Sequence, residues 1–148
     1  MRAAFVRTTA AIAFAVTLFA CGTEVGRVAF GGEGSASAPM TLKAGEVAFW
    51  TDIDIDYKGD AALAYRIELA QDGATVATAT CDPLGHMSAK VSWVETNIGS
   101  SHSRRGNGKM GCATTLAKAG PTTLKATLAF ATKPAELTLK KADLVVKQ

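Results

Sequence analysis

The segment from Asn97 to Lys109 holds the densest set of groups that could bind a ligand. It is rich in Gly and Ser, and it contains His102, Arg104, Arg105 and Lys109 within eight positions. Guanidinium groups and backbone amides together can hold phosphate, sulfate or an acidic glycan. A long loop without secondary structure of its own is often functional. We therefore predict a polar loop here, which is either only solvated or binds an anionic ligand.

A second polar group consists of Asp52, Asp54 and Asp56, which share one predicted strand face with Trp50. Neighbouring carboxylates on that face lie about 6.5–7 Å apart, so a calcium ion would need further ligands such as Asp60. An exposed Trp beside carboxylates is also an arrangement that can bind a sugar ring. The alternatives are a solvated face that blocks edge pairing, and a Trp covered by neighbouring chain.

Catalytic chemistry has little support. His86 and His102 are the only histidines, and neither has a nucleophile or a carboxylate at a spacing typical of a catalytic site. Ser101 and Ser103 flank His102, but sequence neighbours on a loop do not form a triad. We expect no catalytic residue, no enzyme activity and no cofactor, with a small hydrolase as the alternative.

The N-terminus has the pattern of a secretory signal: basic residues precede an apolar centre that is too short to span a bilayer as a helix. It ends in Leu18-Phe19-Ala20-Cys21, which resembles the lipobox of bacterial lipoproteins, although Phe19 replaces the usual small residue. The resemblance implies cleavage before Cys21 and attachment of a diacylglycerol and of acyl chains such as palmitate to that residue. The alternative is an ordinary secreted protein in which Cys21 is a free thiol.

The same resemblance implies a location. Several acyl chains exceed the two signals that lasting membrane attachment requires. Gly22 stands where lipoproteins retained at the inner membrane of enteric bacteria have Asp. We expect a protein of the bacterial cell envelope that is lipid-anchored at the outer membrane and has envelope proteins as partners.

The cysteine count agrees with this assignment. With Cys21 attached to lipid, Cys81 and Cys112 remain as a pair in an oxidising compartment. No Cys-x-x-Cys spacing favours a metal site instead. A Cys81–Cys112 disulfide is therefore predicted.

Charge and size exclude some functions. The chain has 148 residues and a net charge of +3, enough for one domain and too weakly basic for a dedicated nucleic-acid binder. The charge is unevenly divided, because residues 21–85 carry four basic and ten acidic side chains whereas residues 86–148 carry ten and three. These halves either lie against each other or form opposite poles.

Period-two alternation dominates the chain after residue 40. It is clearest from Val47 to Tyr57, and Asp72-Gly73 is a hairpin signal between two further strands. In the last strand the apolar phase slips, and a β-bulge around Lys140-Lys141 would restore it. Seven or eight strands in one domain predict an all-β antiparallel sandwich.

The strand pattern is similar to jelly-roll, galactose-binding-like modules. The resemblance rests on the early strand Leu42–Trp50 and on the closing segments Leu124–Leu128 and Leu137–Val146. The expected organisation is a signal peptide at 1–20, a lipidated N-terminus and flexible tether at 21–40, and a jelly-roll-like sandwich at 41–148.

The sequence supports two hypotheses for the function of the protein, and they belong to different classes. The first is a non-enzymatic, lipid-anchored interaction or structural module of the cell envelope. The alternative is a module that binds a glycan or another anionic ligand through the 97–109 segment, with Trp50 as a possible stacking residue.

Overall fold

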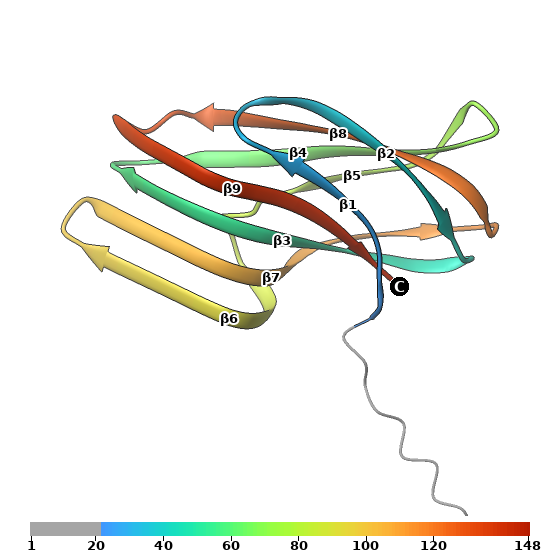
Figure 1. The fold of residues 1–148 in the computed structure, drawn as a ribbon, viewed down its shortest axis with the longest axis horizontal. Coiled ribbons are helices and arrows are strands. Elements are labelled where there is room, and N and C mark those ends of the chain that lie inside the picture. Colours follow the sequence, from blue (N-terminus) through green and yellow to red (C-terminus); the bar gives the residue numbers. More distant parts are fainter. Residues whose placement is uncertain (1–21) are drawn as a thin grey trace, which may run out of the picture.

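Nine antiparallel strands form two sheets that pack face to face in the computed structural model, which describes residues 22–148 (Figure 1). The five-stranded sheet contains, in spatial order, β1 (Glu24–Phe30), β9 (Glu136–Lys147), β3 (Gly45–Lys58), β7 (Ser101–Leu116) and β6 (Met87–Ile98). The four-stranded sheet contains β2 (Gly34–Leu42), β8 (Gly120–Thr132), β4 (Ala62–Gln71) and β5 (Ala74–Cys81). The predicted all-β sandwich is confirmed. The predicted signal segment and Cys21 lie outside the described residues.

The core lies between the sheets and follows the predicted alternation. On β3, the residues that alternate from Val47 to Tyr57 are all buried. They meet buried side chains from the opposite sheet, among them Tyr65, Leu69, Leu124 and Leu128. The hydroxyl of the buried Tyr65 lies 3.1 Å from Thr51 Oγ1, so these two polar groups of the core are close enough to share a hydrogen bond. The apolar stripe on every second residue therefore determines which face of each strand turns inward.

Two local expectations about turns and register hold. Asp72 and Gly73 have φ values of 52° and 78° and connect β4 to β5 in a two-residue hairpin. In the β3–β9 ladder, Asp54 pairs with Lys141 and Ile55 with Leu139. Lys140 is thus the extra residue of a bulge, and this bulge brings both halves of β9 into phase with the core.

The flexible tether predicted within residues 21–40 is wrong, because Gly34–Leu42 forms strand β2 at the edge of the four-stranded sheet. Ala36 and Ala38 turn partly inward and Met40 is buried, so this strand does alternate. Its inward side chains are small, which makes the hydrophobic pattern weak in the sequence. With β1 also a strand, the sandwich begins before residue 41 and has nine strands rather than seven or eight.

The polar loop predicted between residues 97 and 109 is also wrong. Gly99 and Ser100 form a two-residue turn, and the chain pairs along β6 and β7 on either side of it. Gly99 has a φ of 59°, a value that suits Gly at the first central position of a hairpin turn. The segment is thus a regular hairpin at the side of the five-stranded sheet.

Both ends of the sandwich chain meet at one end of the molecule. The Thr23 amide donates to Gln148 O at 2.7 Å, and the Gln148 amide donates to Thr23 O at 3.1 Å. The tip of the β6–β7 hairpin lies at the opposite end (Figure 1). Within residues 22–148, no helix is long and apolar enough to cross a membrane.

Candidate functional site

The three aspartates of β3 are paired with cations from neighbouring strands. Lys141 Nζ lies 2.5 Å from Asp52, Arg105 Nε lies 3.0 Å from Asp54, and Lys140 Nζ lies 2.8 Å from Asp56. The hydrogen bond from Lys140, together with one from Ser103, lowers the pKa of Asp56. Within the described part of the chain, no group of three or more His, Cys, Asp or Glu side chains is arranged to hold a metal ion. The calcium interpretation therefore has no geometric support.

Arg27 of β1 also contacts charged residues of the five-stranded sheet. Its guanidinium contacts Glu24 at 2.9 Å, Asp143 at 2.8 Å and Asp52 at 3.1 Å. The hydrogen bonds with Glu24, and then those with the two aspartates, raise the pKa of Arg27 above its already high ordinary value. Asp143 is a buried charged residue, so this contact neutralises a group that solvent does not reach well.

Of the two alternatives for Trp50, exposed or covered, the structure shows the covered one. It lies on the outer face of the five-stranded sheet, between Lys109 of β7 and Val145 of β9, and only 2% of it is accessible. Lys147 covers the ring, with its Nζ 3.9 Å from the ring centroid. A long cationic side chain thus covers the indole. A sugar ring therefore has no access to stack on Trp50.

The basic residues predicted to share one site lie on two faces. Ladder pairing places Arg105 and Lys109 on the outer face beside Asp54 and Trp50. His102 and Arg104 have the other parity and lie opposite inward-facing residues of β3. Because side chains alternate along a strand, the hairpin separates cations that a loop could have brought together.

Arg104 is part of a local network beneath the hairpin. Its Nη1 donates to the carbonyl of Leu84, and its Nη2 lies 3.3 Å from Glu95. Glu95 also accepts a hydrogen bond from the Trp93 indole at 3.3 Å, and this bond is the main cause of its lowered pKa. Lys90 completes the network, 3.7 Å from Glu95 and above the Trp93 ring. The Arg104 guanidinium is thus already engaged within the protein.

His102 lies near the tip of the hairpin. Its ring stacks on Tyr57 with centroids 4.9 Å apart, and its Nδ1 lies 2.7 Å from Asn97 Oδ1. Both rings line a hollow of about 310 Å³ that also includes Ser101 and Ser103. His86 is remote, because its neighbour Met87 pairs with Met110, about 26 Å farther along β7 from His102. The two histidines therefore do not meet in one site.

Cys81 and Cys112 form the predicted disulfide, with a Cα–Cα distance of 5.4 Å. Cys81 ends β5 in the four-stranded sheet, and Cys112 lies in β7 of the other sheet. The bond thus links the two sheets through β7, the strand next to the edge strand β6.

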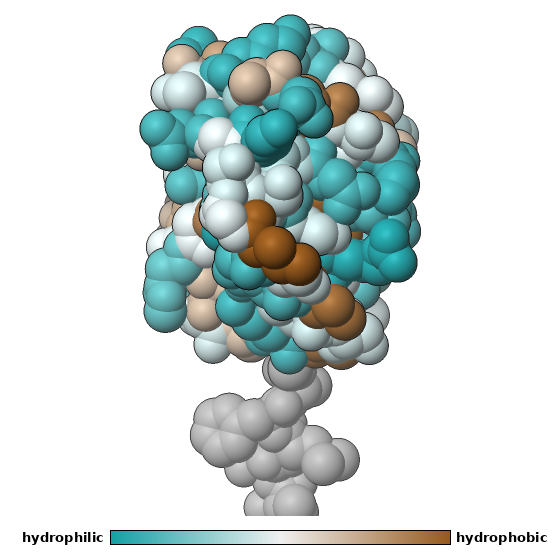
Figure 2. Space-filling model, turned by 90° about the vertical axis from the view of Figure 1, so that its left-hand side faces the viewer, coloured by the Kyte–Doolittle hydropathy of each residue, from teal (hydrophilic) through white to brown (hydrophobic). Residues whose placement is uncertain are grey.

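A candidate binding surface that the sequence did not indicate lies on strand β6. Val91, Val94 and Ile98 are large apolar residues with exposed fractions of 49%, 61% and 73%. Strict alternation from Met87 would place Val91 and Trp93 on the core side of β6. The register shift between Met87 and Ala89 breaks that alternation and turns Val91 outward, and the shift between Val91 and Val94 leaves Val94 opposite Arg105, on the same outer face. Figure 2 shows the hairpin-tip end of the molecule, where hydrophobic residues form a short band among hydrophilic ones.

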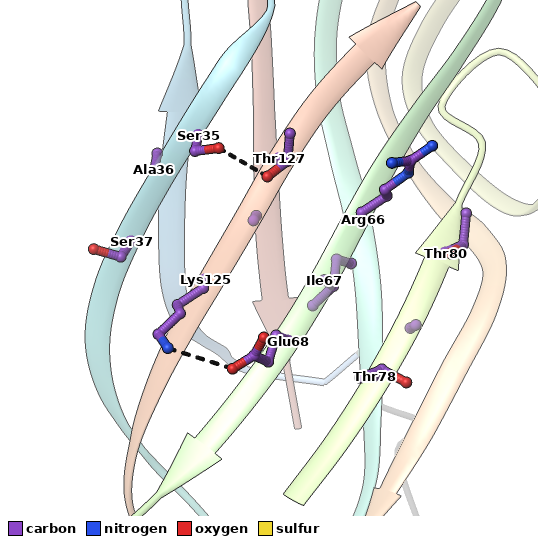
Figure 3. A pocket seen from close by; sticks show the side chains of 12 residues that line it. Ser35, Ala36, Ser37, Arg66, Ile67, Glu68, Thr78, Thr80, Lys125 and Thr127 are labelled. Carbon is purple, nitrogen blue, oxygen red and sulfur yellow. Dashed lines mark hydrogen bonds and ion pairs between the residues drawn. The ribbon is translucent and has the colours of Figure 1, made fainter. Parts of the chain in front are cut away.

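A second surface feature lies on the outer face of the four-stranded sheet. A hollow of about 620 Å³ extends across β2, β8, β4 and β5 (Figure 3). It is lined by serines and threonines, by alanines and Ile67, and by three charged residues, Arg66, Glu68 and Lys125. The sequence pattern indicated β4, β5 and β8 but not β2, and none of the lining residues had a motif that marks a ligand site.

No protein-family model matches the chain, and no curated protein sequence matches it.

Proposed function

We propose that this protein is a non-enzymatic, lipid-anchored module of the bacterial cell envelope that binds another envelope protein along the edge of β6. The anchor rests on the N-terminal signal pattern and on the lipobox-like Leu18-Phe19-Ala20-Cys21. Gly22 after the lipidated Cys favours the outer membrane over the inner one.

The observation that carries the binding proposal is the apolar edge of β6. Within residues 22–148, β6 pairs only with β7 and leaves its other side without a strand. Proteins commonly protect such edges with charges, Pro or short length, because a free edge can pair with another chain. Here the outer face of the edge instead presents Val91, Val94 and Ile98. An extended segment with apolar side chains at alternate positions would gain both main-chain hydrogen bonds and apolar contacts.

The strand order supports a separate role for β6. Without it, the remaining strands form two four-stranded sheets, β1-β9-β3-β7 and β2-β8-β4-β5. Eight strands in two such sheets fit the jelly-roll resemblance that we propose for the domain. Strand β6 is an addition at the side of that framework, so its apolar face is not needed to complete the sandwich core.

The position of the edge also suits an anchored protein. Gly22, the residue after Cys21, lies at the end of the sandwich where Thr23 and Gln148 pair. The hairpin that carries Val94 and Ile98 extends toward the opposite end (Figure 1). A lipid on Cys21 would therefore leave the tip of β6 directed away from the membrane that holds the protein.

The anchor can be tested with a fatty-acid probe in cells that express the full chain. We expect the wild-type protein to be labelled and Cys21→Ala to remain unlabelled. Cys81→Ser is the matched control, because it removes a different cysteine and should keep the label. Labelling of Cys21→Ala would contradict the lipid anchor.

The binding edge can be tested with a photo-cross-linking amino acid placed at Val94 or Ile98 in the native envelope. Val76 is the matched control, because it is an exposed valine on β5, at the edge of the other sheet. We expect one cross-linked product of higher mass from both β6 positions and none from Val76. A Val91→Lys change should weaken the Val94 product, because a charge opposes strand addition.

Three results would contradict the binding proposal. The first is equal cross-linking at Val76 and at the β6 positions. The second is a product with twice the mass of the chain, which would mean that β6 pairs with a second copy. The third is a complete absence of products from Val94 and Ile98 in a protein that is correctly folded and anchored.

A further inference from the structure

The hollow on the four-stranded sheet has walls made of short side chains. Ser35 and Ser37 come from β2, Thr127 from β8, and Thr78 and Thr80 from β5. Because these side chains are short, the sheet surface stays low along its middle, and the hollow reaches about 620 Å³. That volume lies within the usual range for small-molecule sites.

The chemistry of the walls is that of a site for hydroxyl groups. Each Ser or Thr hydroxyl can donate one hydrogen bond and accept two. The Ser35 and Thr127 hydroxyls lie 2.8 Å apart across β2 and β8, which leaves each of them with further bonding capacity (Figure 3). A polyhydroxylated ligand can use donors and acceptors in this way, whereas an apolar ligand cannot.

One charged pair in the hollow is already neutralised. Lys125 Nζ lies 3.3 Å from Glu68 Oε1, and the Thr75 hydroxyl donates to the same oxygen at 2.7 Å. These hydrogen bonds, with that of Thr75 the larger, lower the pKa of Glu68, so the carboxylate is charged near neutral pH. Lys125 and Glu68 together add almost no net charge.

Arg66 is different. Among the four arginines in residues 22–148, Arg27, Arg104 and Arg105 each have a carboxylate partner, and Arg66 has none. In Figure 3 its guanidinium extends beside Thr80, and no interaction connects it to another lining residue. The hollow thus carries one uncompensated positive charge, on the side chain best suited to bidentate contact with a carboxylate.

We infer that this hollow binds an acidic saccharide, with Arg66 holding a sugar carboxylate and the serine and threonine side chains bonding to the ring hydroxyls. This goes beyond protein binding at β6, because it uses the outer face of the other sheet. It also differs from the anion site expected at residues 97–109, where Arg104 and Arg105 already have carboxylate partners.

The test is calorimetric titration of the full chain, purified in detergent, with a trisaccharide of galacturonic acid. Arg66→Gln removes the charge and keeps much of the side-chain length, and Arg66 is exposed and forms no ion pair within residues 22–148. Arg105→Gln is the matched control, because it removes an exposed arginine from the other sheet. We expect Arg66→Gln to weaken binding about tenfold or more, the usual effect of losing a hydrogen bond to a charged group. Arg105→Gln should leave binding unchanged.

Two further titrations identify the ligand class. The neutral galactose trisaccharide should bind more weakly than the acidic one, because it lacks the carboxylate. Inorganic sulfate should not compete at equal concentration, because it does not use the hydroxyl walls. The inference would be overturned by no binding at about 10 mM acidic trisaccharide, by equal binding in Arg66→Gln, or by sulfate that binds as well as the saccharide. Failure here leaves the β6 cross-linking result unaffected, because the two surfaces share no residue.

Discussion

Arg105 of β7 lies with its Nε 3.0 Å from the carboxylate of Asp54 at the centre of β3. The pair joins the acidic first part of the sequence to the basic second part. The same relationship recurs where Asp56 meets Lys140, where Glu68 meets Lys125 and where Glu33 meets Lys133. Of the two arrangements open from the sequence, the halves therefore lie against each other, because the strand order places late strands beside early ones in both sheets.

Arg27→Met should destabilise the protein by about 1–3 kcal/mol, the usual cost of leaving a buried polar group without its partner. The affected group is Asp143, which is buried and lies 2.8 Å from the Arg27 guanidinium. Urea unfolding of both proteins measures the difference. In the Arg27→Met background, Asp143→Asn should recover part of the loss, because a neutral amide costs less to bury than a carboxylate. No recovery would mean that Asp143 is not the group that Arg27 stabilises.

Stability should fall with acid through the carboxyl groups whose pKa values are lowered in the fold. Glu95 is such a group, because the Trp93 indole and then Arg104 favour its charged form. Such a group binds a proton less readily when folded than when unfolded. Its contribution is therefore complete above the ordinary glutamate pKa of 4.5 and is lost as the pH falls through the lower folded value. Melting temperatures measured from about pH 7 down to about pH 2 should show this decline.

Glu95→Gln provides the matched control for that decline. It should lower the melting temperature near neutral pH, where the wild-type carboxylate is charged. As the pH falls through the lowered pKa of folded Glu95, the wild-type carboxylate becomes neutral like the Gln side chain, so the difference should shrink. A difference that stays the same over the whole range would assign the effect of Glu95 to packing rather than to its charge.

Reduction of the Cys81–Cys112 bond should destabilise the sandwich. The bond spans 31 residues, and the chain-entropy model gives about 3–4 kcal/mol for a loop of this size. Denaturant unfolding with and without reductant measures this loss, and the mass of the chain should rise by about two protons on reduction. Cys81→Ser/Cys112→Ser should match the reduced wild type and no longer respond to reductant. A response to reductant in the double variant would show that another group is responsible.

The parts of the fold that the sequence made predictable are those with a strong local signal. The β3 core face follows from six alternating positions, the β4–β5 hairpin from Asp72-Gly73, and the β9 bulge from a phase slip at Lys140. The disulfide followed from an even pair of cysteines. Each of these depends on residues that are close in sequence or on a simple count, so no tertiary information was needed.

The parts that were not predictable depend on contacts between distant strands. Trp50 has outward parity, and only the position of Lys147 shows that its ring is covered. The binding candidates Ile98 and Arg66 have no motif, because exposure and the lack of a partner are properties of the assembled sheets. The 97–109 segment has the composition of a loop. Two of its glycines, Gly106 and Gly108, lie so close to β6 that a Cβ would meet Ser92 O and Met87 Sδ, a packing reason that appears only when β6 and β7 are paired.

Gly106→Ala tests that packing reason. Gly106 has a φ of 133°, and a Cβ there would lie 2.5 Å from Ser92 O and 2.8 Å from Trp93 Cα on the bulged part of β6. Backbone atoms cannot move aside as a flexible side chain can, so we expect a loss of about 1–3 kcal/mol in unfolding free energy. Gly111→Ala is the matched control on the same strand, since its nearest neighbour would be His86 O at 3.7 Å, an ordinary contact. An equal loss of unfolding free energy in the two variants would mean that general strand flexibility, and not the close approach of β6, explains the glycine at position 106. We expect a clear loss for Gly106→Ala and little change for Gly111→Ala.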